Sequence, residues 1–286
     1  MKETSKKLVE KHWDYTSHAK FYEYRPNYAP NSIDMLLLAA KNATNAMLSG
    51  GGGANLSLKA ESKHEKCKGL SVADIGAGTG NLSIMLLERG CEVVAVEPND
   101  AMREIGQERT KDSRYMHHIQ WKCAGGLDTG LESHAYDWVT FGSSFNVLDR
   151  DKALIETHRI LKKGGLFSCM WNHRDLNDPI QEIAEEVILS IIPDYMRGVR
   201  RESQREKIEQ HKDLFEHIIY IEEDFTFHQS IESYILAWRS VKNPYWDLET
   251  QEGEELFEKI AYSLRHSLPS EFGIKYTTRA WSARAK

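Results

Sequence analysis

Three glycines that alternate with other residues directly after an apolar run are the residues of this chain best suited to build a binding site. The run covers residues 71–75, and Gly76, Gly78 and Gly80 follow it. Glycine has no Cβ, so it lets a backbone turn sharply and come close to a ligand. A second apolar run ends in Glu97, whose carboxylate can accept both hydroxyl protons of a ribose. Together these features predict a crevice that binds a nucleoside.

The spacing of the glycines distinguishes two kinds of nucleoside ligand. Dinucleotide sites read G-x-G-x-x-G, because a third glycine brings a helix N-terminus up to the pyrophosphate. This chain reads G-x-G-x-G, with Asp74 just before the turn. The tighter turn and its acidic neighbour favour a ligand that has a charged amino group and no pyrophosphate. S-adenosylmethionine fits this description, and an NAD(P)-dependent oxidoreductase is the alternative that the spacing disfavours.

The same residues resemble the first motif of the class I S-adenosylmethionine-dependent methyltransferases, in which an acidic residue precedes G-x-G-x-G and the second strand ends in an acidic residue. The resemblance implies a Rossmann-like α/β fold, with a seven-stranded, mostly parallel sheet and helices on both faces. It also implies S-adenosylmethionine as cofactor and methyl transfer by in-line displacement to an O, N, S or C nucleophile of a small-molecule substrate. A non-catalytic protein that binds S-adenosylmethionine to regulate a partner is a further alternative.

Further matches follow in the order of the family's motifs. Residues 97–102 resemble the segment that runs along the adenosine, and residues 124–131 stand where a loop caps the adenine. Residues 136–141 resemble the fourth strand, and residues 160–167 resemble the turn into the fifth. The cofactor-binding residues that this resemblance implies are Asp74, Gly76, Ala77, Gly78, Gly80, Glu97, Pro98, Met102, Gly126, Leu127 and Phe141.

The resemblance continues outside this core. Residues 21–28 read F-Y-E-Y-R-P-N-Y and resemble the N-terminal segment of a subgroup that includes trans-aconitate methyltransferase-like small-molecule enzymes. In that subgroup the segment folds over the cofactor and the substrate. Residues 225–240 and 276–281 likewise resemble its sixth strand, the following helix and the last strand.

Candidate acceptor residues lie beyond the carboxyl ends of the fourth and fifth strands, where open α/β sheets bind ligands. His173 is the candidate catalytic base, because an imidazole titrates near neutral pH, although it can equally cap a helix or order its loop. Arg174 can pair a substrate carboxylate, or it can pair Asp175 or Asp178. The other candidate substrate residues are Tyr22, Tyr24, Arg25, Ser143, Asn146, Trp171 and Trp238.

Several aromatic residues near the C-terminus permit two interpretations. They either form a wall for a cationic or planar acceptor or pack in the core. These residues are Tyr234, Trp238, Trp246 and Trp281.

The elements that must position these residues follow from the helix and strand signals. Residues 1–69 should form an N-terminal helical lid and a Gly-rich loop, with a helix over residues 33–40 that Ser32 caps. Residues 70–175 should form the S-adenosylmethionine-binding core, and residues 176–215 a helical cap. Residues 216–286 should complete the sheet, with strands over 216–229 and 274–284 and helices over 231–240 and 253–266.

Composition narrows the functional classes. The chain has 286 residues, 41% of them apolar, and a net charge of −6, which disfavours binding to a nucleic acid. No run of 18 apolar residues occurs, so we expect no membrane span and a cytoplasmic protein. The four cysteines lie far apart and indicate neither a metal site nor a disulfide. Nothing in the sequence indicates the oligomeric state.

Overall fold

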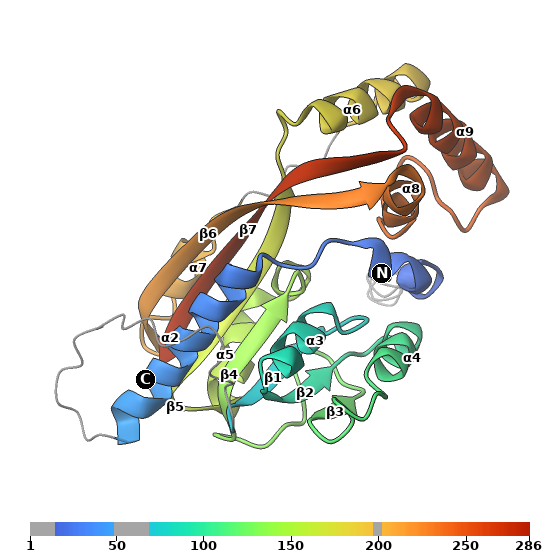
Figure 1. Cartoon of the computed structure of the whole chain (residues 1–286). Helices are drawn as coiled ribbons and strands as arrows, with labels where there is room; N and C mark the ends of the chain where they lie inside the picture. Colours follow the sequence, from blue (N-terminus) through green and yellow to red (C-terminus); the bar gives the residue numbers. More distant parts are fainter. Residues whose placement is uncertain (1–14, 49–68, 197–201) are drawn as a thin grey trace, which may run out of the picture.

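A computed structural model describes residues 15–48, 69–196 and 202–286 (Figure 1). They form one seven-stranded sheet with the strand order β3-β2-β1-β4-β5-β7-β6. The strands are β1 Ser71–Ile75, β2 Glu92–Val96, β3 Ile119–Lys122, β4 Tyr136–Gly142, β5 Leu161–Arg174, β6 Phe215–Ser230 and β7 Glu271–Ala285. Strands β1 to β5 are parallel to one another, whereas β7 is antiparallel to both β5 and β6. The predicted α/β fold with a mostly parallel sheet is confirmed.

Helices cover both faces of the sheet. Val72 and Trp138 face helices α2 and α3, while the next residues along their strands, Ala73 and Val139, face α5. This alternation is the period of two that a strand imposes. The helices are η1 Thr16–Tyr24, α2 Pro30–Leu48, α3 Asn81–Glu88, α4 Asp100–Arg109, η2 Phe145–Val147, α5 Arg150–Ile160, α6 Pro179–Ile191, α7 Arg205–Glu209, α8 Ile231–Arg239 and α9 Gln251–Ser267.

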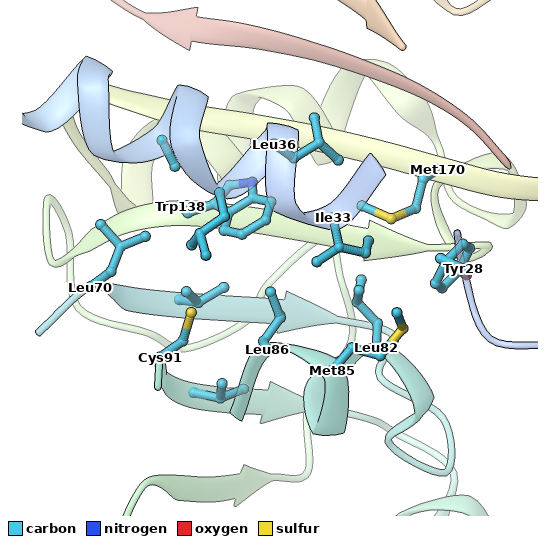
Figure 2. Packing of buried hydrophobic residues seen from close by; sticks show 14 of the residues in the cluster. Tyr28, Ile33, Leu36, Leu70, Leu82, Met85, Leu86, Cys91, Trp138 and Met170 are labelled. Atoms are coloured by element: carbon cyan, nitrogen blue, oxygen red, sulfur yellow. The ribbon is translucent and has the colours of Figure 1, made fainter. Parts of the chain in front are cut away.

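Helix α2 is part of the main core. Figure 2 shows Ile33 and Leu36 of α2 above the sheet, near Trp138 of β4 and Met170 of β5. Each of these four side chains is fully buried. Burying one large apolar side chain stabilises a fold by roughly 1.5–3 kcal/mol. The N-terminal region therefore contributes a structural helix, α2, in addition to a segment that can act as a lid.

Helix α2 differs from its prediction at its start. It begins at Pro30. Proline has no N–H, and the first residue of a helix does not need one because its N–H would make no intrahelical hydrogen bond. The prediction that Ser32 caps the helix is wrong. Its N–H and its hydroxyl both donate to Glu223 Oε2, at 2.6 and 2.8 Å. The serine thus ties the first turn of α2 to the edge strand β6.

The ends of β5, β6 and β7 extend beyond the parallel strands and carry a second apolar core (Figure 1). Helices α6, α8 and α9 pack there around Tyr234, Trp238 and Phe257, and we call these three helices the cap. Helix α7 lies in the stretch 176–215 that was predicted as one helical cap, but its Ile208 packs in the core below, with Phe215 of β6. The division of the chain into domains stays a prediction. Among the described helices, none is long and apolar enough to span a bilayer.

Candidate functional site

The glycine turn after β1 adopts a backbone that only glycine accommodates without strain. Gly76, Gly78 and Gly80 have φ values of 67°, 58° and 85°. A Cβ on Gly76 would lie 2.5 Å from Cβ of Ser144, so this glycine also permits a close approach to the loop after β4. A Cβ on Gly78 would meet nothing within 4 Å. The middle glycine therefore faces open space.

The turn is fastened to the end of β2. Val96 O accepts hydrogen bonds from Gly76 N and Ala77 N, at 2.8 and 3.1 Å. The Glu97 carboxylate accepts from Gly78 N at 2.9 Å and from Asn99 N at 2.8 Å. Burial raises the pKa of Glu97, and these two N–H groups oppose the rise. Glu97 is thus held beside the open glycine.

Asp74 lies beneath the turn and is only 1% exposed. Ser83 donates to its Oδ2 at 2.6 Å, and Thr140 donates to its Oδ1 at 2.9 Å. Burial, together with a smaller contribution from the charge of Glu97, raises the pKa of Asp74 to about 6 against these two hydrogen bonds. With both oxygens occupied by hydroxyl groups, Asp74 supports the turn from below and adds negative charge there.

The segment after Glu97 starts helix α4. The Asn99 side chain caps this helix by accepting from Met102 N at 3.0 Å. Pro98 is exposed and Met102 is buried. Of the two predicted contacts in this segment, only the proline therefore presents its side chain to solvent.

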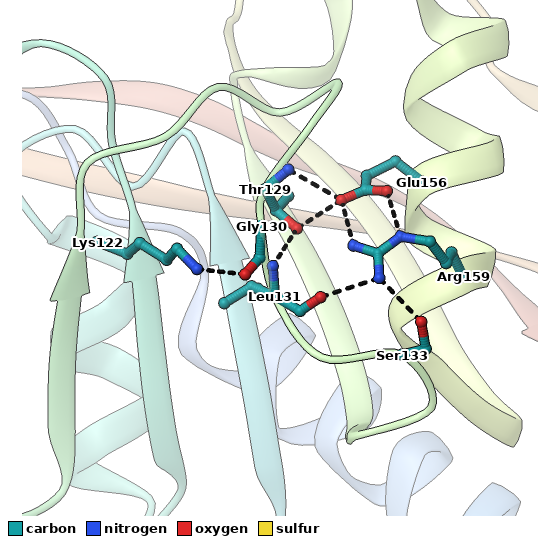
Figure 3. A network of polar contacts seen from close by, with 7 residues as sticks. All are labelled: Lys122, Thr129, Gly130, Leu131, Ser133, Glu156 and Arg159. Atoms are coloured by element: carbon teal, nitrogen blue, oxygen red, sulfur yellow. Dashed lines mark hydrogen bonds and ion pairs between the residues drawn. The ribbon is translucent and has the colours of Figure 1, made fainter.

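The loop after β3 is held in place by a polar network, which Figure 3 shows. Glu156 of α5 accepts from Thr129 N at 2.9 Å and pairs with Arg159 at 2.7 Å, and Arg159 also donates to Leu131 O at 2.9 Å. Burial raises the pKa of Glu156, but the hydrogen bonds from Arg159 and Thr129 outweigh it and leave the pKa lowered. The network thus ties the loop to helix α5.

Two residues of this loop were predicted to contact the cofactor. A Cβ on Gly126 would lie 2.6 Å from Leu148 and 2.9 Å from Ile75, so the backbone packs tightly there. Leu127, the next residue, is 39% exposed. A large apolar side chain is thus presented on a fixed loop.

The loop after β4 brings Ser143 to Tyr28 of the N-terminal segment. Ser143 has a φ of 62°, which is unusual for a residue other than glycine. Its Oγ lies 3.0 Å from the Tyr28 hydroxyl, and its N–H donates to Met170 O. Burial raises the pKa of Tyr28 well above its ordinary value. Tyr28 was not among the predicted site residues, and its place at the end of the R-P-N-Y motif was the signal available in the sequence.

Other predicted residues near β4 and β5 have structural contacts. The Phe141 ring is fully buried against Phe145 and Phe167, so it supports the core and does not line the crevice. The Trp171 indole donates to Asn146 Oδ1 at 3.0 Å. This hydrogen bond ties the loop after β4 to the end of β5.

The segment 25–29 crosses β5 and β7 as a strap between η1 and α2. Asn172 of β5 donates to Pro26 O and Asn27 O, at 3.1 and 3.0 Å, and accepts from Thr278 of β7 at 2.6 Å. Thr278 in turn accepts from Ala29 N at 2.8 Å. Asn172 and Thr278 were not predicted as site residues, because only the tertiary fold brings them under this strap.

The first part of the strap is joined to the cap. Arg25 donates to Ser240 Oγ at 2.7 Å and to Ser240 O at 2.8 Å, and its guanidinium lies 4.1 Å from the Tyr22 ring centre. Asn99 of α4 donates to Thr16 of η1 at 3.1 Å. The helix η1, which also contains the partly buried Tyr24, therefore connects the parallel part of the sheet with α8 (Figure 1).

His173 lies on the sheet face opposite Asn172, because consecutive residues of a strand alternate. Trp171 and Glu222 share its face. The pKa of Glu222 is lowered, first by a hydrogen bond from Tyr220 and in smaller part by the charge of His173. The candidate base is therefore not on the strap side of the sheet, where Tyr28 and Asn172 lie.

Arg174 is on the strap side and reaches the cap. Its Nε lies 3.2 Å from the Tyr276 hydroxyl, and its guanidinium lies 4.4 Å from the Trp238 ring centre. Tyr234, Trp238 and Trp246 of the predicted aromatic wall gather in the cap. Trp281, the fourth member, lies on the opposite face and packs against Trp171 and Tyr220, so the prediction of one wall is wrong for Trp281.

The arrangement as a whole is a crevice at a topological switch point. From β1 the chain proceeds to β2 and β3 on one side, while β4 and β5 lie on the other. Ligands of open α/β sheets bind beyond the carboxyl ends of the strands at such a point. The glycine turn, Glu97 and Ser143 all lie there.

Comparison with known proteins agrees with this geometry. Residues 73–169 match the methyltransferase domain family. A ubiquinone/menaquinone biosynthesis C-methyltransferase from Idiomarina loihiensis is 27% identical over 140 residues, which are 48% of this chain and 56% of that protein. An uncharacterized methyltransferase from Mycobacterium bovis is 28% identical over 151 residues, which are 53% of this chain and 48% of that protein. The chain thus spans about half the length of these curated relatives.

Residues 73–169 thus form a methyltransferase domain of the class I S-adenosylmethionine-dependent type. Its cofactor is S-adenosylmethionine. The structure of a putative type II methyltransferase from Anaeromyxobacter dehalogenans shares the fold, with a TM-score of 0.51 and 16% identity over 76% of this chain and 89% of that one. The finer resemblance to the trans-aconitate methyltransferase-like subgroup stays a prediction.

Proposed function

We propose that this methyltransferase transfers the methyl group of S-adenosylmethionine to a nucleophilic atom of a small-molecule acceptor. The observation that supports this most directly is the open side of Gly78 next to the Glu97 carboxylate. A glycine turn with open space beside Gly78, at the switch point of the sheet, is suited to hold a nucleoside and its amino-acid tail.

The residues around the turn fit the chemical groups of the cofactor. The Glu97 carboxylate has about four lone-pair positions, and two accept protein N–H groups, so others remain for ribose hydroxyls. Leu127 offers an exposed apolar surface for the adenine, and Pro98 does the same along the adenosine. The negative charge of Asp74 beneath the turn favours the ammonium of the methionine tail.

The protein's part in the reaction is to align the reactants and exclude water. S-adenosylmethionine supplies a methyl group whose bond to sulfur breaks as the acceptor's lone pair bonds to carbon, with the electron pair left on sulfur. The strap and η1 lie over the sheet and join the cap through Arg25 and Ser240. Tyr28 and Ser143 fix the strap where it passes the end of β4. Holding reactants in line can supply several kcal/mol of the barrier reduction.

We propose that His173 contributes little as a base. It lies on one face of β5, whereas Asn172 and the strap that Asn172 binds lie on the other face. An acceptor nucleophile with a free lone pair needs orientation more than deprotonation. Ser143, Asn146 and the strap residues remain the proposed surroundings of the acceptor, whereas Trp171 shares the face of His173 and is not among them.

A small acceptor is also favoured over a nucleic acid. The net charge of −6 opposes the release of counterions that drives binding to a polyanion. The segment that crosses β5 is fastened to the sheet by three hydrogen bonds that involve side chains, so it covers the strap side of β5. A cytoplasmic location stays a prediction.

Two measurements on the full chain test this function. Calorimetric titration should show binding of S-adenosylhomocysteine and none of NADH or NADPH. Incubation of the protein with isotopically labelled S-adenosylmethionine and fractionated metabolite extracts should then give a labelled small molecule. Binding of a nicotinamide dinucleotide alone would indicate the oxidoreductase, and cofactor binding without any labelled product would indicate a regulatory protein.

A further inference from the structure

Arg174 is a cation that has no anionic partner among the described residues, and its surroundings are largely apolar. A guanidinium has five N–H donors, and the contact with Tyr276 accounts for one of them. Within residues 15–48, 69–196 and 202–286, no carboxylate pairs with it. Asp178 instead caps α6 and accepts from Lys275 N, and Asp175 accepts from Asn177 N. Neither of the predicted intramolecular partners is therefore used.

The rings around Arg174 carry further donors that are not used. The Tyr234 hydroxyl and the Trp238 Nε1 are buried, and neither has a hydrogen-bond partner among the described residues. Burial raises the pKa of Tyr234 to about 12, opposed by the charge of Arg174 and by the nearby Trp238 indole, which approaches without the alignment of a hydrogen bond. An unpaired buried donor costs about 1–3 kcal/mol.

These groups share one chemical property. A guanidinium, a phenol and an indole all donate hydrogen bonds, and the guanidinium and the indole cannot accept one. The guanidinium lies 4.4 Å from the Trp238 ring centre and 5.8 Å from that of Tyr234, so the three groups lie close together. A planar oxyanion satisfies several of these donors at once, because it accepts two parallel hydrogen bonds from a guanidinium.

The position of Arg174 separates this group from the reacting atom. Met170, Asn172 and Arg174 lie on one face of β5, and Met170 is the strand partner of Gly142, beside the cofactor crevice. Four residues of a strand span about 13 Å. An anion held at Arg174 is thus displaced along the strand from the end of β4.

We propose that Arg174, with Tyr234, Trp238 and Tyr276, anchors an oxyanion of the acceptor, and that the methyl group is transferred to a different atom of that molecule. The proposal rests on the function proposed above and adds a substrate class to it. The acceptor is a small molecule with a carboxylate or a phosphate at one end and its nucleophile at the other. The aromatic rings of the cap favour an apolar or planar body next to the anion.

Binding of simple probes tests the anchor. With the protein saturated with S-adenosylhomocysteine, benzoate and inorganic phosphate represent the two kinds of oxyanion, and benzamide is a neutral control of the same shape as benzoate. We expect calorimetry to show binding of at least one anion and none of benzamide. Arg174→Gln should weaken that binding on the order of tenfold or more, because a hydrogen bond to a charged group is lost.

Matched variants keep the result interpretable. Arg174→Lys keeps the charge but not the paired donors, so its loss should be smaller. Arg205→Gln removes a surface arginine that pairs with Glu209 and should change nothing. Unchanged S-adenosylhomocysteine affinity in Arg174→Gln would show that the variant is folded. Equal binding of benzamide, no binding of either anion, or full anion affinity in Arg174→Gln would overturn the proposal.

The labelled product of the methylation screen tests the second half. Fragmentation in a mass spectrometer should place the labelled methyl group on an atom other than an oxygen of its carboxylate or phosphate. A label on a carboxylate or phosphate oxygen would refute the separation of anchor and nucleophile. The benzoate titration repeated without S-adenosylhomocysteine separates the two proposals, since it tests Arg174 even if cofactor binding fails.

Discussion

The crevice at the ends of β1 and β2 and the cap beyond β5 differ in how their buried polar groups are satisfied. In the crevice, both carboxylate oxygens of Asp74 and of Glu97 accept hydrogen bonds from the protein itself. In the cap, the Tyr234 hydroxyl and the Trp238 indole are buried without a partner in the part of the chain that the structure describes. The buried carboxylates of the crevice are thus satisfied by the protein itself, whereas these two donors of the cap have no partner among the described residues.

This difference indicates that the crevice recognises the cofactor and that the cap recognises the acceptor. The crevice residues between Asp74 and Glu97 belong to one strand-helix-strand unit, so local backbone geometry fixes them before anything binds. The residues of the proposed anion site come from β5, β7 and α8, and the donors that have no partner among the described residues gain one only with a ligand. A common cofactor suits the first arrangement, and a particular acceptor suits the second.

The largest effect should come from Gly78→Val, which tests the crevice side of the comparison. The valine would occupy the open side of the turn at a φ of 58°, which a β-branched residue strongly disfavours. We expect the affinity for S-adenosylhomocysteine, measured by calorimetry, to fall on the order of a hundredfold or more, about 3 kcal/mol.

Gly69→Val is the matched control for backbone strain. Gly69 also has a positive φ, 92°, and open space around its Cβ position, but it precedes β1, away from the turn. The control should lose a similar amount of thermal stability and keep its affinity. Normal affinity in Gly78→Val would refute the placement of the cofactor.

The next largest effect concerns Asp74 and pH. Its pKa rises from 3.8 unfolded to about 6 folded, so between about pH 4 and pH 6 the folded state binds more protons than the unfolded state. The free energy of unfolding therefore decreases as pH rises through this window, by about 3 kcal/mol at most. Asp74→Asn should remove this dependence and, without ligand at pH 8, be at least as stable as the natural protein in chemical denaturation.

The same substitution should have the opposite effect on binding. The ionised Asp74 favours the cofactor's ammonium, so Asp74→Asn should weaken the binding of S-adenosylhomocysteine at pH 8. Affinity of the natural protein should fall as pH drops below about 6. A variant that is less stable than the natural protein at pH 8 but binds equally well would show that Asp74 is purely structural.

A third test compares the two regions directly through one hydroxyl in each. Ser83→Ala removes a buried donor to Asp74 and should lower the free energy of unfolding by about 1.5–3 kcal/mol. Tyr234→Phe removes a buried hydroxyl that has no hydrogen-bond partner within the described residues, and it should leave stability unchanged or raise it by about 1 kcal/mol. Denaturant unfolding of both variants without ligand measures the contrast. Equal destabilisation would remove the distinction between a complete crevice and an incomplete cap.

The smallest effect is expected for His173→Gln. The side chain lies on the face away from the strap, so kcat/KM with the identified acceptor should fall less than about tenfold. Loss of a general base typically costs about 10²–10⁴ in rate. A loss in that range, together with the disappearance of an inflection on the acid side of the pH-rate profile, would establish His173 as the base after all.

Much of the fold could be predicted from the sequence, because the decisive signals are local. The apolar runs, the glycine spacing and Glu97 mark two strands and the turn between them, and β6 and β7 lie close to the stretches predicted for them. The start of α2 was wrong because the hydroxyl of Ser32 binds Glu223, nearly two hundred residues away in the chain. Such a partner leaves no local trace.

The candidate site divides in the same way. The sequence alone determined the glycine turn, since a positive φ and a close approach to Ser144 leave no other residue type suitable. Only the tertiary structure decided that Tyr28 meets Ser143, that no carboxylate in the described part of the chain pairs with Arg174, and which tryptophans share a face. The local sequence does not distinguish Trp238 from Trp281. Trp238 nevertheless lies in the cap, whereas Trp281 lies in the core on the opposite face of the sheet. The sequence period of a helix or strand shows which residues share one face of that element. Which other residues pack against this face depends on segments that are distant in the sequence.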